Sequence, residues 1–271
     1  MSESNHWYNK DGIAVHQVQG KTVEWRPTNI SDARKLSLFP SVSGIIKQWY
    51  NPALERYKIQ QTIEAAKNYL TEYPIDEICQ DEKSYFSFVN KSASEAALNA
   101  AKLGTIVHQA IEASFAGNEW DKEEILTNHE GVEIPVKQFV NSAMSVIEEF
   151  YVQDSELTVV DEEYGYAGTI DVSAFKDGEF YILDFKTTKT TAGKPIEPKQ
   201  GHPMQLAAYY QALHGNIDNI KAANVYISTN EIGRVDFVEY SKEELTKQWH
   251  GFEACLTLWR LANDYDPRIT T

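Results

Sequence analysis

The feature that most constrains this chain is an Asp-Gly pair between two short segments rich in strand-forming residues. Residues 169–176 and 179–185 contain many Val, Ile, Tyr and Phe, and Asp177-Gly178 stands between them. An Asp-Gly pair favours the tight turn of a β-hairpin. The two segments are therefore expected to form neighbouring antiparallel strands, which brings side chains at matching positions together.

The polar side chains of this predicted hairpin form a compact pattern. A hairpin centred on the turn pairs residue 173 with residue 182. The same register sets Asp171 opposite Asp184, and Lys186 points to the same face as Asp184 because the two are two residues apart. Two close carboxylates repel each other unless a cation lies between them, and hard oxygen ligands favour magnesium or manganese. The pattern indicates a metal site beside a lysine, and the alternative is an Asp–Lys pair on a half-buried strand.

Two helical motifs, one on each side of the hairpin in sequence, support the metal interpretation. His108 lies on a predicted helix, and an imidazole can ligate a metal, although a lone histidine on an apolar helix is more often a core residue. Gln205 and Tyr209 are four residues apart on another predicted helix and therefore share one face. We expect that face to lie against the strand that carries Lys186.

The order of strand and helix signals predicts a mixed α/β fold in a single domain spanning residues 1–271. Within it we expect an N-terminal hairpin extension at 1–30, a helical subdomain at 38–116 and an α/β catalytic core at 135–263. The expected helices cover residues 52–70, 92–115, 203–213 and 242–262, with one more beginning at Pro135. The expected strands cover residues 156–167, 169–176, 179–185, 222–229 and 233–239.

Charge and composition exclude several classes of protein. Of the residues, 42% are apolar and 24% charged, which is ordinary for a globular protein and excludes disordered, collagen-like and coiled-coil chains. The net charge is −15, but residues 117–163 hold thirteen acidic and two basic side chains and so account for most of it. Because local charge decides local fields, the acidic total does not exclude a nucleic-acid substrate.

The location predicted from the sequence is the cytoplasm. No apolar stretch approaches the ~20 residues of a membrane span, and the first residues lack the basic and apolar runs of a secretory signal. Two cysteines, Cys79 and Cys255, are too few for a disulfide framework and suit a reducing compartment.

Four motifs occur in order along the chain: Gly104-Thr105-x-x-His108, Gly168-x-x-Asp171, Asp184-x-Lys186-Thr187 and Gln205-x-x-x-Tyr209. This ordered set resembles the RecB-type branch of the PD-(D/E)XK nuclease superfamily, most closely the mitochondrial genome maintenance exonuclease and its phage relatives. The resemblance covers about residues 38–240 and includes the Pro40-Ser41-Val42-Ser43 segment.

The resemblance implies a restriction-endonuclease-like core, in which helices flank a mixed β-sheet, with a helical arch-like subdomain before it. It implies that the metal ligands are His108, Asp171, Asp184 and the carbonyl of Phe185. A magnesium or manganese ion is the implied cofactor. An iron–sulfur cluster, which some relatives hold on four cysteines, is not expected in a chain with two cysteines.

The resemblance also implies roles for the remaining motif residues. Lys186 matches the lysine that orients and activates water, while Gln205 and Tyr209 match residues that contact the substrate strand and steady the lysine. Relatives often carry a glutamate before the Gly-x-x-Asp strand, for which Glu162 and Glu163 are the candidates and Glu163 is preferred.

The implied activity is metal-dependent hydrolysis of DNA phosphodiester bonds by an exonuclease acting on single-stranded ends. The setting would be DNA replication, recombination or repair in a phage or prokaryote, with proteins of those processes as partners and the host cytoplasm as the location for a phage protein. A double-strand end-processing exonuclease of the phage recombination type and an inactive DNA-binding nuclease fold are the alternatives. Polarity, metal count, processivity and oligomeric state stay open.

Two groups of residues are candidates for DNA contact. Thr187 and Lys189 begin a polar, lysine-containing loop that can hold backbone phosphates, although a solvated loop would have the same composition. Trp49 and Tyr57 alternate with basic residues in the helical region, a pattern suited to stacking on single-stranded bases. Most aromatic side chains on helices belong to a core, so we expect only one or two of these to reach DNA.

Overall fold

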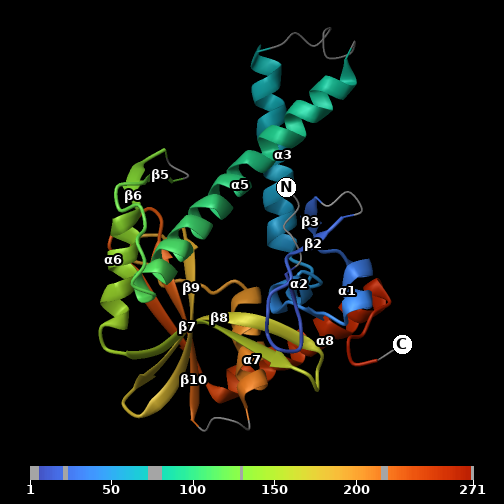
Figure 1. Ribbon diagram of the computed structural model, residues 1–271. Coiled ribbons are helices and arrows are strands. Elements are labelled where there is room, and N and C mark those ends of the chain that lie inside the picture. The colour runs from blue at the N-terminus through green and yellow to red at the C-terminus, as the bar shows by residue number, and fades with distance from the viewer. Residues whose placement is uncertain (1–5, 21–23, 73–80, 129–130, 215–218, 270–271) are drawn as a thin grey trace.

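The computed structural model places a five-stranded mixed sheet at the centre of the molecule (Figure 1). It describes residues 6–20, 24–72, 81–128, 131–214 and 219–269. The sheet strands run in the order β11-β10-β9-β8-β7. They are β7 (Tyr151–Asp161), β8 (Tyr166–Lys176), β9 (Glu179–Thr188), β10 (Ile220–Ser228) and β11 (Val235–Tyr240).

Strands β9 and β10 are parallel, and the other three pairs are antiparallel, so the sheet is mixed. The parallel pair arises because helix α7 (Gly201–Leu213) connects β9 to β10 as a crossover. Helices flank this sheet, which confirms the predicted fold class, a mixed α/β core of the restriction-endonuclease-like kind.

The β8–β9 hairpin has the register that its turn predicts. Asp177 and Gly178 have φ of 53° and 83°, the left-handed values that a type I′ turn requires at both central positions. Ser173 pairs with Ile182, so the predicted register is confirmed. The paired residues end one step before Asp171 and Asp184, where the two strands carry the polar side chains of the predicted site.

Each face of the sheet has its own apolar core. Phe180 and Ile182 pack with α7 and α8, whereas Leu183 and Phe185 pack with α5 and α6. This alternation along β9 is what a strand buried on both faces requires. The helices that cover the two faces are α1 (Ile30–Leu36), α2 (Val42–Ile46), α7 and α8 (Lys242–Asn263) on one side, and α5 (Glu82–Phe115) and α6 (Val136–Ile147) on the other.

Helices α3 (Pro52–Glu72) and α5 project together from the sheet, toward the top of Figure 1. We call residues 52–72 and 81–102 the helical arm. Among the described side chains of α5, those in its last part, from Leu103 to Phe115, pack into the core against α6 and the sheet. Helix α5 begins ten residues before the predicted start at Ser92, because the side chain of Asp81 accepts a hydrogen bond from the Ser84 N–H and caps the helix there.

The N-terminal residues form the expected short hairpin and also enter the core. Strands β2 (Gln17–Gln19) and β3 (Trp25–Pro27) pair around Gly20. Strand β1 (Trp7–Tyr8) pairs with β4 (Phe39–Pro40), and the Trp7 ring is buried against Trp259 of α8. A further small hairpin, which the sequence did not indicate, joins β5 (Ile125–Thr127) and β6 (Glu133–Pro135) before α6. In the described part of the chain, no helix is long and apolar enough to cross a membrane.

Candidate active site

The polar ends of β8 and β9 form the centre of the candidate active site. Asp184 is fully buried, and the Lys186 Nζ lies 2.8 Å from each of its carboxylate oxygens. Both side chains leave β9 on one face, as the spacing predicts. The buried carboxylate therefore has the cationic partner that its burial requires.

Burial and neighbouring charges act in opposite directions on this pair. Burial raises the pKa of Asp184 to about 6, although the ammonium of Lys186 opposes the rise. Burial alone would lower the pKa of Lys186, but the carboxylates of Asp184 and Asp171 outweigh it and raise that pKa. Lys186 therefore stays protonated at neutral pH and compensates the negative charge of the two aspartates.

Helix α5 brings His108 to the second carboxylate. The Oδ2 atom of Asp171 accepts a hydrogen bond of 2.7 Å from the N–H of Phe185 and lies 3.5 Å from the Nδ1 of His108. His108 reaches this position because Leu103, Val107 and neighbouring apolar side chains of α5 bury the opposite part of the helix in the core. The structure thus brings His108, from a distant part of the sequence, to Asp171, Asp184 and Lys186 on the β8–β9 hairpin.

Two motif glycines are required by close packing around this centre. A Cβ at Gly168 would lie 2.7 Å from the Tyr209 Cε1 atom, so only glycine lets the Tyr209 ring lie against β8. A Cβ at Gly104 would lie 3.2 Å from the Thr187 Oγ1 atom, so this glycine permits the close approach of α5 to β9. Thr187, predicted to contact DNA, thus packs beside α5.

Helix α7 presents the two predicted side chains as a bonded pair. The Gln205 Nε2 donates to the Tyr209 hydroxyl at 3.1 Å. Burial, with the charge of Asp184 as the next cause, raises the pKa of Tyr209 well above its ordinary value. The Tyr209 hydroxyl is therefore a neutral donor close to the aspartates.

Two residues near the aspartates were not predicted from the sequence, Asn224 and Glu156. The Asn224 Nδ2 on β10 donates to Asp184 Oδ2 at 2.7 Å. Glu156 on β7 has a φ of 57° and lies between residues that pair with the two neighbours of Asp171. Although Glu156 as a whole is exposed, burial of its carboxyl group raises its pKa to about 7, and the charges of Asp171 and Glu112 add to the rise. In the sequence, Asn224 stands out as an amide inside an apolar strand and could have been predicted as a site residue. The residues around Glu156 do not distinguish it from the other glutamates of that segment.

The structure does not bring Glu163 to this site. Glu163 is exposed in the turn between β7 and β8, and its carbonyl accepts a hydrogen bond from Arg268. The resemblance implies a glutamate before the Gly168-x-x-Asp171 strand, with Glu163 as the preferred candidate. In an antiparallel pair, however, the residue opposite Asp171 lies well back along β7, and that residue is Glu156.

The candidate DNA contacts lie at the surface. Trp49, after α2, and Tyr57, on α3, are 45% and 40% exposed, which leaves both rings able to stack on a base. Lys189 is exposed directly after β9. The structure thus leaves all three side chains accessible.

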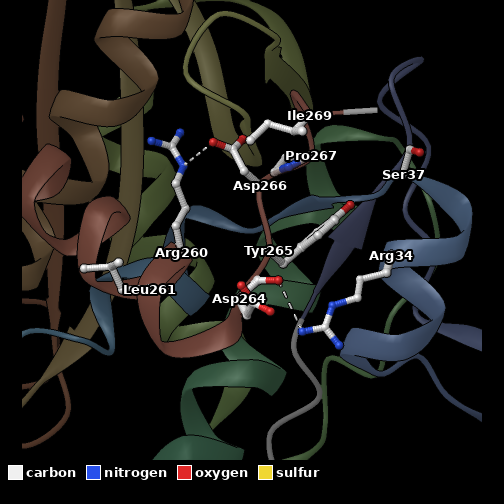
Figure 2. Close-up of a pocket in the computed structure, with 9 residues that line it drawn as sticks. All are labelled: Arg34, Ser37, Arg260, Leu261, Asp264, Tyr265, Asp266, Pro267 and Ile269. Atoms are coloured by element: carbon white, nitrogen blue, oxygen red, sulfur yellow. Dashed lines mark hydrogen bonds and ion pairs between the residues drawn. The ribbon is translucent and has the colours of Figure 1, made fainter. Parts of the chain in front are cut away.

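A pocket of about 370 Å³ lies elsewhere, where the end of α8 meets α1 (Figure 2). Its two arginines already bind main-chain carbonyls: Arg34 donates to Asn263 and Arg260 donates to Tyr164. None of the site residues lines this pocket. The bond from Arg34 joins α1 to the end of α8.

The donor chemistry at the sheet end fits a divalent cation. Two carboxylates, an imidazole and the Phe185 carbonyl are the oxygen and nitrogen ligands that Mg²⁺ and Mn²⁺ accept. Within the described ranges, no three His, Cys, Asp or Glu side chains are already gathered closely enough to hold an ion. The carboxylates instead have protein partners: Lys186 and Asn224 bind the Asp184 oxygens, and the Phe185 N–H donates to Asp171. Cys255 is buried in α8, and Cys79 lies outside the described residues.

A comparison with protein families agrees with this chemistry. Residues 84–266 match the model of the PD-(D/E)XK nuclease superfamily. No curated protein sequence matches the chain. A crystal structure of a candidate exonuclease from Eubacterium rectale is 15% identical with a TM-score of 0.43, and the match covers 64% of this chain and 69% of that one. The structure of the protein SSO0001 is 16% identical with a TM-score of 0.31, covering 82% of this chain and 91% of that one.

Proposed function

The chain belongs to the PD-(D/E)XK nuclease superfamily, and on that premise we propose that it is a Mg²⁺- or Mn²⁺-dependent exonuclease of the RecB-type branch. Its substrate is a single-stranded DNA end, and its setting is replication, recombination or repair in a phage or prokaryote. The observation that carries the proposal is the buried Asp184–Lys186 pair beside Asp171 and His108. Nucleases of this superfamily generally use divalent metals such as Mg²⁺.

The cation would be held by His108, Asp171, Asp184 and the Phe185 carbonyl. When bound, it supplies Lewis acidity toward the scissile phosphate and lowers the pKa of a bound water. Lys186 carries a fixed positive charge, which stabilises the charge that develops on the phosphate oxygens and orients the attacking water.

The bonded pair on α7 acts beside this lysine. The Tyr209 hydroxyl stays protonated and receives a hydrogen bond from Gln205, so it can donate in turn to a phosphate oxygen. This neutral donor contacts the substrate strand without adding charge to a site where two carboxylates and one ammonium leave a net negative charge for a cation to neutralise.

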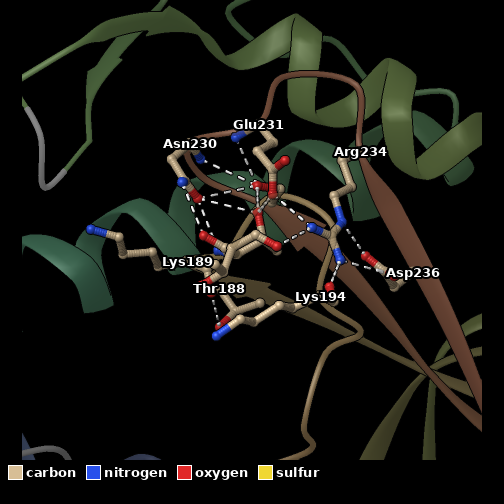
Figure 3. Close-up of polar contacts among 10 residues, drawn as sticks. Thr188, Lys189, Lys194, Asn230, Glu231, Arg234 and Asp236 are labelled. Carbon is tan, nitrogen blue, oxygen red and sulfur yellow. Dashed lines mark hydrogen bonds and ion pairs between the residues drawn. The ribbon is translucent and has the colours of Figure 1, made fainter.

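A polar network supports phosphate binding by the loop that follows the site (Figure 3). We call residues 189–200 the lysine loop. The Thr190 N–H donates to Asn230 at 2.8 Å, and Arg234 donates to the carbonyls of Thr191 and Lys194. These bonds hold the start of the loop against the β10–β11 turn, and the Lys189 side chain extends outward from the drawn network. A loop held in this way presents lysines to a DNA backbone at small entropic cost.

The helical arm supports a single-stranded substrate. The exposed ring of Tyr57 stands on α3 with Lys58 next to it in sequence, and the exposed ring of Trp49 lies shortly before that helix. Aromatic rings interleaved with basic side chains bind single strands by stacking and phosphate contact. A duplex hides the faces of its bases, so this surface favours a single strand over the double-strand alternative.

Digestion of end-labelled oligonucleotides tests the proposal. Single strands blocked at the 5′ end, the 3′ end or both, and a matching duplex, are incubated with Mg²⁺, with Mn²⁺ and with excess chelator. We expect stepwise shortening of the single strand that requires the cation and stops when one particular end is blocked. Asp184→Asn should abolish the cleavage while leaving the melting temperature close to that of the wild type. Full digestion in chelator would refute the metal requirement. Cleavage of strands blocked at both ends would refute the exonuclease activity.

A further inference from the structure

We infer that Asn224 is a positioning residue, which fixes the orientation of the Asp184 carboxylate for the cation and the substrate phosphate. The inference rests on the proposed function and assigns a role to a strand, β10, that none of the sequence motifs includes. It is carried by the place of Asn224 in the sheet, by the bond from its amide to Asp184, and by the hydroxyl that holds the amide.

The place of Asn224 in the sheet is unusual for a polar side chain. It is the parallel partner of Asp184 in the β9–β10 register and is fully buried, between Ala223 and Val225. A buried amide costs free energy unless its donors and acceptor all find partners. An apolar residue would fill this position without that cost, so the amide is expected to serve the carboxylate beside it.

The amide nitrogen binds one oxygen of the carboxylate. The Asn224 Nδ2 donates to Asp184 Oδ2 at 2.7 Å and lies 3.5 Å from the Asp184 carbonyl oxygen. The Lys186 Nζ lies 2.8 Å from each oxygen of the same carboxylate, so the amide and the ammonium together fix its orientation. A hydrogen bond from a neutral amide also favours the ionised carboxylate, which is the form that ligates a cation.

The amide itself cannot turn around. The Tyr240 hydroxyl donates to Asn224 Oδ1 at 2.8 Å, and the Tyr226 hydroxyl lies 3.5 Å from the same oxygen. Burial raises the pKa of Tyr240 to about 12, so its hydroxyl keeps its proton and remains a donor. Because a donor faces Oδ1, the Nδ2 group has to point at Asp184.

The Tyr226 hydroxyl is held in turn by the first turn of α7. It lies 2.9 Å from the Nδ1 of His202. Burial lowers the pKa of His202 to about 3, so this imidazole is neutral. In the tautomer with its proton on Nδ1, it donates to the Tyr226 oxygen and leaves the Tyr226 proton for Asn224 Oδ1. Bonds thus run without interruption from α7, which carries Gln205 and Tyr209, through Asn224 to Asp184. The arrangement resembles the hydrogen-bonded partners that orient ligands in many metal sites.

The experiment measures cation affinity without DNA, using the full chain. Mn²⁺ is titrated calorimetrically into the wild type, Asn224→Leu, Tyr240→Phe and a matched control, Asn128→Leu. Asn128 is also a buried asparagine, but its amide donates to the Thr229 carbonyl and accepts from the Val132 N–H. Both leucine variants lose a buried amide of similar size, so a general effect on stability appears in both.

We expect Asn224→Leu to weaken Mn²⁺ binding roughly 10–100-fold, as loss of an orienting partner does in other metal sites. Tyr240→Phe keeps the amide but releases its orientation, so a smaller loss in the same direction is expected. Asn128→Leu should bind Mn²⁺ as the wild type does. At saturating Mn²⁺ and DNA, turnover should fall in the order wild type, Tyr240→Phe, Asn224→Leu.

A folded Asn224→Leu variant that binds Mn²⁺ and cleaves within twofold of the wild type would overturn the inference. If Asn224→Leu does not fold, Tyr240→Phe decides, and wild-type Mn²⁺ affinity in that variant overturns the inference. Failure of the proposed function looks different: the wild type itself then binds Mn²⁺ but leaves DNA intact, or binds none.

Discussion

The sheet region and the helical arm both contain large apolar side chains but bury them very differently. In the sheet, residues such as Ile182, Leu183 and Phe185 are inaccessible to solvent, and α5 through α8 cover both faces. In the arm, Ala65 and Val89 are the buried apolar residues among the side chains that the structure describes there. Large exposed side chains of the arm are Leu54, Tyr57, Ile59, Ile63, Leu70, Phe86 and Leu98.

From this difference we expect the sheet to determine stability and the reaction rate, and the helical arm to determine DNA affinity. Substitutions that remove contacts in the sheet should change the free energy of unfolding or the reaction rate, because cavities and overpacking are costly there. Substitutions at exposed positions of the arm should leave both nearly unchanged and should act on DNA affinity. Each prediction below would break that separation if it failed.

The largest effect is expected for Lys186→Ala. Turnover should fall by orders of magnitude, because the charge that develops in the transition state lies beside this side chain. Binding of single-stranded DNA with Ca²⁺ present should weaken only modestly, and the salt dependence should lose about one unit of slope. Affinity and turnover are measured separately on one labelled oligonucleotide. Normal turnover at saturation together with very weak binding would make Lys186 a binding residue only.

A smaller but clear effect is expected for Gly168→Ala. The added Cβ meets the Tyr209 ring at 2.7 Å, so the ring or β8 has to move. The free energy of unfolding should fall by about 1–3 kcal/mol, as overpacking usually costs, and cleavage should fall with the displacement of Tyr209. Urea unfolding and single-turnover rates report the two effects.

Gly251→Ala is the control for this overpacking. A Cβ there would lie 3.0 Å from the Met204 Cε, the far end of a flexible side chain that can give way. The control should unfold at nearly the wild-type urea concentration and keep full cleavage. An equal loss of stability in the two variants would show that the loss in Gly168→Ala does not come from overpacking against the Tyr209 ring.

Tyr57→Ala tests the arm. If the ring stacks on a base, the variant should lose about 1–3 kcal/mol of single-strand affinity and still cleave at saturating DNA. Its melting temperature should stay at the wild-type value because the ring is exposed. Tyr151→Ala is the control, since Tyr151 is an exposed aromatic residue on β7, outside the arm. Equal affinity losses in both variants, or a lowered melting temperature for Tyr57→Ala, would count against the separation.

The smallest effect concerns Glu156 and pH, measured in chelator. In the folded protein the pKa of Glu156 is raised to about 7, whereas the ordinary value is 4.5. Between these values the folded state binds more protons than the unfolded state, so its stability falls as the pH rises. Glu156→Gln should remove this loss.

The gain of Glu156→Gln over the wild type should therefore be larger at pH 8 than at pH 4. Because Glu156 is exposed, solvent screening limits the gain to about 1 kcal/mol. Melting temperatures across this pH range measure it. Glu163→Gln, in the exposed β7–β8 turn, is the control, and an equal trend in both variants would show that the effect does not come from the site.

Local rules were enough to predict the centre of the site. The Asp177-Gly178 pair determines a hairpin turn by its own backbone preference, and the turn sets the register of β8 against β9. Alternation along one strand then places Asp184 and Lys186 on the same face. These inferences need only the few residues between the strands, so short-range geometry decides them.

Contacts that depend on distant parts of the chain could not be predicted in the same way. Asn224 reaches Asp184 only because the chain returns through α7 and adds β10 beside β9, some forty residues later. Glu156, rather than Glu163, lies opposite Asp171 because pairing with β8 determines which β7 residue arrives there. The hairpin turn, the shared strand face and the chemical types of the site residues thus follow from local sequence. Which side chains hold Asp184 and Asp171 in place depends on the complete fold, since strand order and helix packing depend on the burial of the whole core.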